Sequence, residues 1–209
     1  MTKDAQNHLP RSQNSFLESL IDLFTGLEEY KSPYAPTIQA PNELIQELIQ
    51  NASLKCALIS GTCSLPPGPL GLLSILPELL MIYRIQGQLV IDIAALLGKE
   101  VQVTKELLLY CMFKNAGAQI FRKVIEESSM RILIRPTTVR FFQSFLEKIG
   151  IMISQRMFRK QFTRWIPIGG AFLTGTLTYY DTKSIGLQAK SLFSKEIETL
   201  SQTSELLTS

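Results

Sequence analysis

A cluster of prolines and glycine interrupts the longest nearly uncharged stretch of the sequence. Between Cys56 and Tyr83 the only charged residue is Glu78, and residues 66–69 read PPGP near the middle. Each apolar arm on either side has about a dozen residues, whereas a helix needs about 20 to cross a bilayer. Because proline breaks a helix interior, we expect a helical hairpin, either buried in the protein or inserted into one leaflet.

Two amphipathic helices are predicted before this hairpin. Residues 1–14 are polar and predict an unstructured tail, after which Ser15 stands at capping-box spacing before Glu18 and apolar residues recur at helical spacing to about Tyr30. Prolines at 33, 36 and 41 then break the chain, and Asn42 is a suitable cap for a second helix. We expect residues 15–54 to form an N-terminal helical cover.

Helical periodicity continues beyond the hairpin. Thr104 is predicted to begin a long helix that ends before Pro136, and two shorter helices are expected over 139–149 and 151–164. Residues 165–180 are apolar and rich in glycine. We expect Asp181 to end this apolar helix, with a polar helix following it through Lys190 and a polar tail over 194–209.

The expected fold class is therefore all-α. A chain of 209 residues suits a single domain, and we find no strand alternation and no repeat. The proline-split hairpin and the glycine-rich apolar helix are predicted to lie at the centre of a helical domain over residues 55–193. In detail, Leu70–Tyr83 and Ile168–Tyr180 should form the central layer, with Gly170 and Gly175 buried against a neighbouring helix.

The sequence lacks the usual catalytic and metal-binding patterns. His8, the only histidine, lies in the polar N-terminal stretch, so Ser/His and Cys/His catalysis lose their usual base. There is no GxxxxGK[ST] and no GxGxxG after a strand. Cys56 and Cys63 share a helix face at a spacing of seven residues, but buried packing is the commoner role of such cysteines. We expect no enzyme activity, metal or cofactor.

An enzyme that uses carboxylates or cysteines in an unfamiliar way is the least favoured alternative. Its candidate residues are Glu78, Asp92, Cys63 and Asp181. The absence of a motif with known chemistry counts against it.

A basic amphipathic helix is the strongest physical signal in the sequence. Four cations fall on one side of the helix predicted over 151–165, and apolar residues, including Trp165, fall on the other. The cations are Arg156, Arg159, Lys160 and Arg164. Such a helix suits an anionic membrane surface, where each cation contributes about 1 kcal/mol. A surface helix with its apolar face in the core remains the alternative.

The positive charge is concentrated in one region. From Arg122 to Arg164 there are ten lysines and arginines against three glutamates, a net charge of +7, whereas the whole chain carries +3. The sequence pI of about 8.7 falls short of the basicity typical of nucleic-acid-binding domains. We therefore expect an anionic membrane surface or a membrane protein as partner, and no nucleic acid.

A polar stripe runs along the second arm of the hairpin and beyond it. Arg84, Gln88 and Asp92 recur every four residues and so share one helix face. We predict an edge that faces solvent or a partner protein.

Two segments resemble the EcsC family. Residues 76–99, LPELLMIYRIQGQLVIDIAALLGK, are similar to that family's apolar helix after a proline, and residues 165–193, WIPIGGAFLTGTLTYYDTKSIGLQAKSLF, are similar to its closing pattern. The likeness covers about residues 55–193 and includes YCMFKNAGAQ and SQRMFRK between the two segments. It implies a bacterial, helical, membrane-associated protein with no established reaction. Asp181, within the closing pattern, is then a possible structural or partner residue.

These observations predict a membrane-associated helical accessory or scaffold protein without catalytic activity, linked to transport or envelope processes. It would be cytoplasmic, peripheral to or partly inserted in the inner membrane, because the N-terminus lacks the basic-then-apolar start of a secretory signal. A soluble helical protein-interaction module whose apolar segments are core is the main alternative.

Overall fold

The computed structural model describes residues 11–37, 41–63, 75–121, 125–127, 130–134 and 167–199. This part of the chain is mainly helical, which confirms the expected all-α class. The α-helices are α1 (Arg11–Glu28), α2 (Pro41–Cys63), α4 (Ile75–Leu96), α5 (Lys105–Phe121) and α7 (Pro167–Phe193), with a short 3₁₀ helix, η2 (Glu100–Gln102). Three short strands complete it: β1 (Ile125–Glu127), β2 (Arg131–Ile134) and β3 (Glu196–Thr199).

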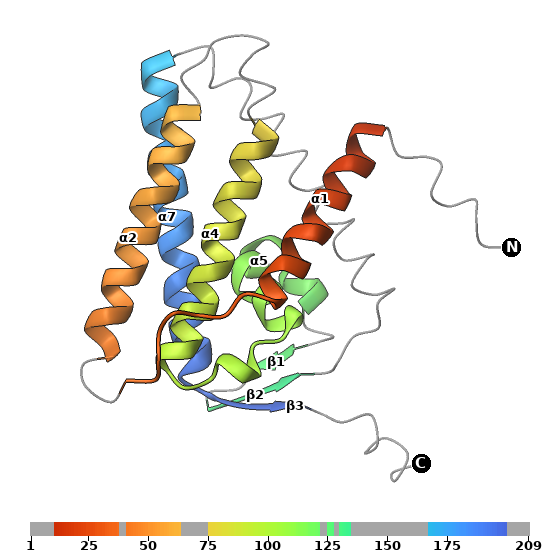
Figure 1. The fold of residues 1–209 in the computed structure, drawn as a ribbon, viewed down its shortest axis with the longest axis vertical. Helices are drawn as coiled ribbons and strands as arrows, with labels where there is room; N and C mark the ends of the chain where they lie inside the picture. Colours follow the sequence, from red (N-terminus) through yellow and green to blue (C-terminus); the bar gives the residue numbers. More distant parts are fainter. Residues whose placement is uncertain are drawn as a thin grey trace, which may run out of the picture.

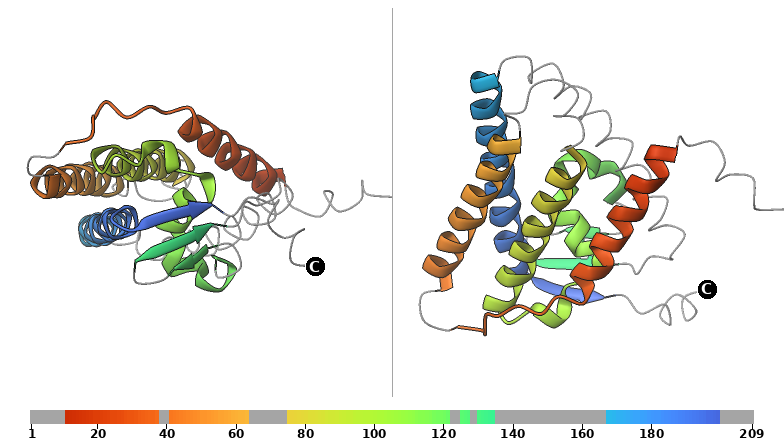
Figure 2. Two further views of the ribbon diagram at one scale, coloured as in Figure 1. Left: turned by 90° about the horizontal axis from the view of Figure 1, so that it is seen from below. Right: turned by 45° about the horizontal axis from the view of Figure 1, so that its top comes forward.

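Helix α4 lies at the centre of the described structure. It contacts α1, α2, α5 and α7, and Figures 1 and 2 show it between α2 on one side and α1 on the other. Its segment Pro77–Leu96 is the one stretch, among the described residues, long and apolar enough to cross a membrane, but 72% of it is buried within the protein. Burial by four neighbouring helices accounts for its apolar composition without a bilayer.

Glycine ends α4 at a defined place. Gly98 has a φ of +72°, in the left-handed region that favours glycine. The amide of Gly98 donates to the carbonyl of Ala95 at 2.9 Å, and that of Lys99 donates to Ala94 at 2.8 Å. These two bonds form a Schellman motif, which satisfies carbonyls at the helix end. The chain then turns through η2 into α5, whose Thr104 caps the amide of Leu107 at 3.4 Å, so α5 begins where the sequence predicted.

Aromatic and aliphatic side chains fill the space between α1, α4 and α5. The rings of Phe24 on α1 and Tyr83 on α4 both meet that of Phe113 on α5, at centroid distances of 6.4 and 5.4 Å. Leu20 and Leu27 complete the buried stripe of α1. This side of α4 is a conventional hydrophobic core.

Helices α2 and α7 cross closely on the other side of α4. They run antiparallel and contact each other along most of their lengths (Figure 1). A Cβ atom placed on Gly175 would lie 3.1 Å from the carbonyl oxygen of Ala57 and 3.8 Å from the Cα of Gly61. Gly175 therefore permits the crossing, and its predicted burial, like that of Gly170, is confirmed.

A small sheet lies below the helices in Figure 1 and was not expected from the sequence. Strand β1 pairs antiparallel with β2, and β2 pairs parallel with β3. The buried side chains of Ile125, Ile132 and Ile134 join the core, and Arg131 forms an exposed ion pair with Glu196 at 3.3 Å. The prediction of one helix from Thr104 to before Pro136 was wrong, because α5 ends at Phe121 and two strands follow. The polar C-terminal stretch likewise contains β3.

The N-terminal helices begin earlier than predicted. Helix α1 starts at Arg11, so Ser15 lies within it rather than at its cap. Helix α2 starts at Pro41, whose missing amide hydrogen and fixed φ suit the first helical position. Asn42 therefore lies in the first turn instead of capping it.

Two predicted interruptions are absent. Helix α2 continues without a break from the expected N-terminal cover into the first arm of the hairpin, so the expected boundary at residue 54 lies inside a helix. Asp181 lies in the middle of α7, which runs on to Phe193 as one helix. Its charge does not stop the helix because the side chain lies on the exposed surface.

The predicted central layer was half wrong. Helix α4 is central, as expected for the second arm of the hairpin, whereas residues 70–74 of the predicted layer lie outside the described residues. The upper half of α7 lies at the edge instead: Phe172 is 79% exposed and Tyr180 63% exposed. One face of this apolar segment therefore packs on α2 while the other faces outward.

We expect substitution of the two glycines at the α2–α7 crossing to have different effects on the stability of the protein. Replacing Gly175 with Ala should destabilise the protein by about 1–3 kcal/mol, because the added methyl meets rigid backbone at 3.1 Å. Replacing Gly61 with Ala places a methyl at an ordinary 3.5 Å from the Ala171 carbonyl and should be neutral or stabilising by up to about 1 kcal/mol. Urea unfolding of both variants measures the difference; equal stabilities would show that the crossing is not tight at Gly175.

Candidate functional site

Polar side chains fill the seam between α2, α4 and α7. Among the described residues, eight polar or charged side chains are buried, and all but Glu106 lie on these three helices. The seven are Ser53, Ser60, Glu78, Gln86, Thr174, Thr178 and Thr182. The interior of this three-helix unit is therefore more polar than the aromatic core on the α1 side of α4.

Hydrogen bonds join the three helices across this seam. The hydroxyl of Ser60 on α2 donates to Oε1 of Glu78 on α4 at 2.9 Å. Lower down, Nε2 of Gln86 on α4 donates to Oγ1 of Thr182 on α7 at 3.0 Å, and to Asp181 at 3.4 Å. Hydroxyls of Thr174 and Thr182 donate to carbonyls one turn back in α7. Side chains that pair across helices fix the register of the three helices.

Two buried polar atoms in the seam have no hydrogen-bond partner among the described residues, the hydroxyl oxygen of Ser53 and Oε1 of Gln86. Cys56 lies nearby, where burial, reinforced by Asp181, raises the pKa of its thiol to about 11. A thiol with this pKa stays protonated at neutral pH and is a poor nucleophile.

The outer face of the α2–α7 pair is apolar. Most of the exposed large hydrophobic side chains in the described structure lie on these two helices. They are Leu44, Leu54 and Leu58 on α2 and Phe172, Leu173, Leu177, Tyr180 and Leu187 on α7. Over residues 54–62 of α2 and 170–180 of α7, the pair thus has a polar inner seam and a largely apolar outer face, the reverse of an ordinary surface helix. The remaining parts of both helices bury apolar side chains, such as Ile49 and Leu192, and expose polar ones.

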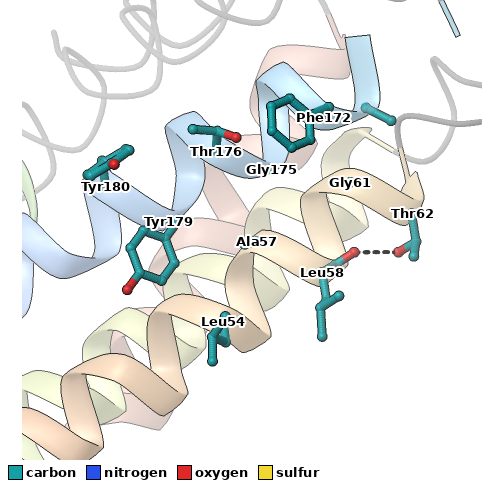
Figure 3. A pocket seen from close by; sticks show the side chains of 11 residues that line it. Leu54, Ala57, Leu58, Gly61, Thr62, Phe172, Gly175, Thr176, Tyr179 and Tyr180 are labelled. Carbon is teal, nitrogen blue, oxygen red and sulfur yellow. Dashed lines mark hydrogen bonds between the residues drawn. The ribbon is translucent and has the colours of Figure 1, made fainter. Parts of the chain in front are cut away.

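An open groove of about 480 Å³ runs between α2 and α7 on this face. Figure 3 shows Leu54 and Tyr179 at one end and Thr62 and Phe172 at the other. Its floor consists of small residues, Ala57, Gly61, Ala171 and Gly175, because the two helices approach closely there. None of the residues that line it is charged. We call this the α2–α7 groove.

Within the described part of the chain, charged residues flank one end of the groove. Lys55 follows Leu54 on α2, and Lys183 stands one turn beyond Tyr179 on α7; both are exposed. Beyond them, α2 from Cys56 to Cys63 and α7 from Pro167 to Tyr180 contain no charged residue. The groove therefore has a lysine end, which also carries the two tyrosine side chains, and an uncharged end.

The structure separates Asp181 from the other residues of the predicted partner edge. Arg84 is exposed and Gln88 half-buried, and both line a pocket of about 350 Å³ against Asp22, Glu29 and other residues of the α1 segment. Asp181 lies across the α4–α7 seam beside Gln86. Asp92 lies on the same side of α4 as Arg84 and Gln88, because it accepts a hydrogen bond from Tyr30, which lines the same pocket. Of the four residues, Asp181 alone lies apart from the others.

Asp92 holds the segment that follows α1 in place through hydrogen bonds. Its Oδ1 accepts hydrogen bonds from the hydroxyls of Ser32, at 2.7 Å, and Tyr30, at 3.1 Å. The amide of Ser32 donates to Oε1 of Glu100 at 2.7 Å. Burial raises the pKa of Asp92, although the two hydroxyls oppose this change. Burial, together with the carboxylate of Asp92, raises the pKa of Tyr30 to about 12.

The predicted basic face lies outside the described residues. This applies to Arg156, Arg159, Lys160 and Arg164, to both helices expected over 139–164, and to Trp165. Within the described residues, no three His, Cys, Asp or Glu side chains gather where they could hold a metal ion.

Sequence reasoning missed the α2–α7 groove because it placed residues 168–180 in the central layer and left the burial of the first hairpin arm open. The signal that marks the inner face is the spacing of small polar residues. Thr174, Thr178 and Thr182 recur every four residues on α7, and all three are buried while the apolar residues between them are exposed. A helix with threonines on its inner stripe has its bulky apolar residues turned outward.

Comparisons with protein-family models, with curated proteins and with solved structures find no match to this chain. The resemblance to the EcsC family stays a prediction from the two sequence segments.

The contribution of the Tyr30–Asp92 hydrogen bond to stability should decrease at alkaline pH. The pKa of Tyr30 is raised from 10.0 to about 12 in the folded protein, so folding favours the neutral phenol. Stability from this group is complete below pH 10 and is lost as the pH rises from 10 to 12. We expect stability to fall more steeply over this range in the native protein than in Tyr30→Phe, measured by urea unfolding at each pH; identical pH profiles would contradict the role of Tyr30.

Proposed function

We propose that the chain is a membrane-associated helical accessory or scaffold protein without catalytic activity, and that the outer face of the α2–α7 pair is its membrane-contacting surface. The observation that carries this proposal is the reversed polarity of the pair. Large apolar side chains such as Phe172 and Leu58 are 79% and 67% exposed, while threonines and serines are buried behind them. Large exposed apolar patches mark membrane or protein interaction sites.

The length of the uncharged segments supports contact with one leaflet. The uncharged segments, Cys56–Cys63 on α2 and Pro167–Tyr180 on α7, rise about 11 and about 20 Å at 1.5 Å per residue. One leaflet contributes about half of the 30 Å hydrocarbon core. Tyr179 and Tyr180 stand where the charged residues begin, the position that tyrosine favours at a membrane–water interface. The pair therefore suits insertion into one leaflet rather than a full crossing.

The position of α1 is compatible with such contact. Its exposed acids Glu18 and Asp22 would oppose insertion if they lay beside the apolar face. Figures 1 and 2 show α1 on the far side of α4 from α2. The charged helix can therefore stay in water while the α2–α7 face meets the lipid.

The charge distribution along the sequence adds to the proposal. Arg156, Arg159, Lys160 and Arg164 belong to the basic region of the sequence, which carries a net charge of +7 from Arg122 to Arg164. Such a concentration of cations attracts anionic headgroups. We accordingly propose a peripheral or partly inserted location on the cytoplasmic side of the inner membrane, with an anionic membrane surface or a membrane protein as partner.

A soluble helical interaction module is the second candidate. The burial of 72% of the most apolar segment of α4 favours it, because such burial is typical of the core helix of a soluble protein. On this candidate the same α2–α7 face binds a protein.

Acidic substitutions on the α2–α7 face should abolish vesicle binding. The double variant Leu58→Asp and Phe172→Asp removes two side chains that would each gain about 1.5–3 kcal/mol on burial, so we expect binding at least about a hundredfold weaker. Flotation with anionic vesicles measures it. The matched control is Val101→Asp with Met130→Asp, which are 99% and 78% exposed but lie away from the pair. Equal loss in both double variants, or no binding by the native protein, contradicts the proposal.

Reversal of the basic residues should act through charge. Changing Arg156, Arg159, Lys160 and Arg164 to Glu removes four cations worth about 1 kcal/mol each near anionic headgroups, close to a thousandfold in affinity at low ionic strength. Added salt should shrink the difference, and binding to neutral vesicles should change little. Anionic-vesicle binding that is unchanged in the variant would show that these cations do not meet the membrane, and unfolding would show that they are structural ion-pair partners.

A further inference from the structure

We infer that the α2–α7 groove holds one acyl chain of an anionic phospholipid, with the headgroup at its lysine end. This inference rests on the proposed membrane association but assigns a specific ligand to the site. The occupant is a lipid molecule ordered against the protein, whereas general insertion needs only the apolar face.

The shape of the groove fits a single chain. It is bounded by two antiparallel helices, and from Leu54 to Thr62 it extends about 12 Å along α2. Its volume of about 480 Å³ lies in the range of small-molecule sites. The small residues Gly61 and Gly175 lower its floor, so that Leu58 and Phe172 form raised walls (Figure 3). An open, uncharged groove of this length accommodates a linear apolar chain against the protein surface.

The lining of the groove is mainly apolar, with Thr62, Thr176 and the two tyrosines as its polar side chains. The hydroxyl of Thr62 already donates to the carbonyls of Leu58 and Ile59, at 2.8 and 3.1 Å. The backbone groups of both walls are bonded within their own helices, so the groove offers no sheet edge to an extended peptide. What remains along most of its length is apolar contact.

The two ends of the groove differ in charge, which orients the occupant. Lys55 and Lys183 are exposed at the lysine end. Asp181, also exposed, accepts a hydrogen bond from Gln86 on the seam side of α7, and Glu47, an exposed acid of α2, stands two turns before Leu54. The other end has no charged residue on either helix. An anionic amphiphile matches this pattern when its headgroup meets the lysines and its chain points to the uncharged end. The phenols of Tyr179 and Tyr180 then stand at headgroup level, where tyrosine is favoured.

The direction of the chain agrees with the proposed insertion. The lysine end is also the water-facing end of the uncharged helix segments, and the groove, at about 12 Å, is slightly shorter than the roughly 15 Å of one leaflet. A phospholipid of the contacted leaflet therefore enters the groove without reversing its orientation. A second copy of this chain would place Lys55 and Lys183 of each protomer on an apolar partner face or against each other, which charge disfavours.

The test uses phosphatidylglycerol spin-labelled on one acyl chain, mixed into vesicles with the full-length protein. We expect electron paramagnetic resonance to show a motionally restricted lipid component. Ala57→Leu and Ala171→Leu, two independent changes that fill the groove floor, should each remove most of this component while flotation of the vesicles with the protein persists. Ser184→Leu, which adds the same bulk to an exposed position of α7 outside the groove, should leave it unchanged.

The headgroup is tested in the same assay. Lys55→Gln and Lys183→Gln should each lower the affinity for the restricted phosphatidylglycerol about fivefold at low salt, the effect of one cation near an anionic headgroup. Spin-labelled phosphatidylcholine should show little change between native protein and variants. Equal restriction of both lipids in all variants would overturn the assignment of the lysine end.

A second measurement separates failure of the groove from failure of membrane association. Short-chain phosphatidylglycerol below its micelle concentration is titrated into the protein without vesicles, and one-to-one binding that Ala57→Leu abolishes supports the groove even if vesicles do not bind. Vesicle binding without a restricted component and without one-to-one binding overturns the groove but leaves the proposed function intact. Dimerisation that Ala57→Leu and Ala171→Leu disrupt, without lipid binding, would show that the groove is occupied by a second copy instead.

Discussion

The described structure depends on covering one helix on every side. Helix α4 is the most apolar long element, and its exposure to water would cost more free energy than that of any other element described here. Helices α1 and α5 cover it with aromatic and aliphatic side chains, and α2 and α7 cover it through a seam of serines, threonines, Gln86 and Glu78. The two sides of α4 differ in chemistry. The side that faces α1 and α5 supplies hydrophobic burial, and the side that faces α2 and α7 fixes the register of three long helices through hydrogen bonds.

The polar seam explains why the outer face of the α2–α7 pair can be apolar. A helix in water normally gains stability by turning its apolar stripe inward. In the first half of α7 the inward stripe consists of Thr174, Thr178 and Thr182. The hydroxyls of Thr174 and Thr182 donate to carbonyls of their own helix, and that of Thr182 also accepts from Gln86. The larger side chains have no room inside, because Gly175 brings the helix axes too close for them. Close packing inside and apolar exposure outside are thus two results of the same sequence pattern.

The fold class and several helix ends could be predicted because they depend on local chemistry. Thr104 caps a helix and Gly98 ends one through bonds that reach only a few residues. The continuity of α7 through Asp181 could not be predicted in this way, because a charge ends a helix only where it would be buried, and burial depends on neighbours far away in sequence.

The sheet and the groove escaped prediction for the same reason. Strands β1 and β2 are three and four residues long, too short for a period of two residues to be distinguished from a helical pattern. Strand β3 forms against β2 across more than 60 residues. Asp92, one of the four residues predicted to form a partner edge, instead forms hydrogen bonds to the segment that follows α1. The inner and outer faces of α7 could not be told apart from the sequence, because they depend on the position of α2.

The order in which the three seam helices are synthesised gives the polar seam a second consequence. Helices α2 and α4 are complete at Leu96, but α7 ends only at Phe193, so on the order of 5–20 s of synthesis separate them at 5–20 residues per second. During that interval Glu78, Gln86 and Ser53 line a trough between two helices that lacks its third wall. Water can solvate these polar groups while they wait, as it could not solvate an equally large trough of leucine. A seam of hydroxyls and amides therefore exposes less apolar surface in a bundle without its last helix than a seam of leucines would.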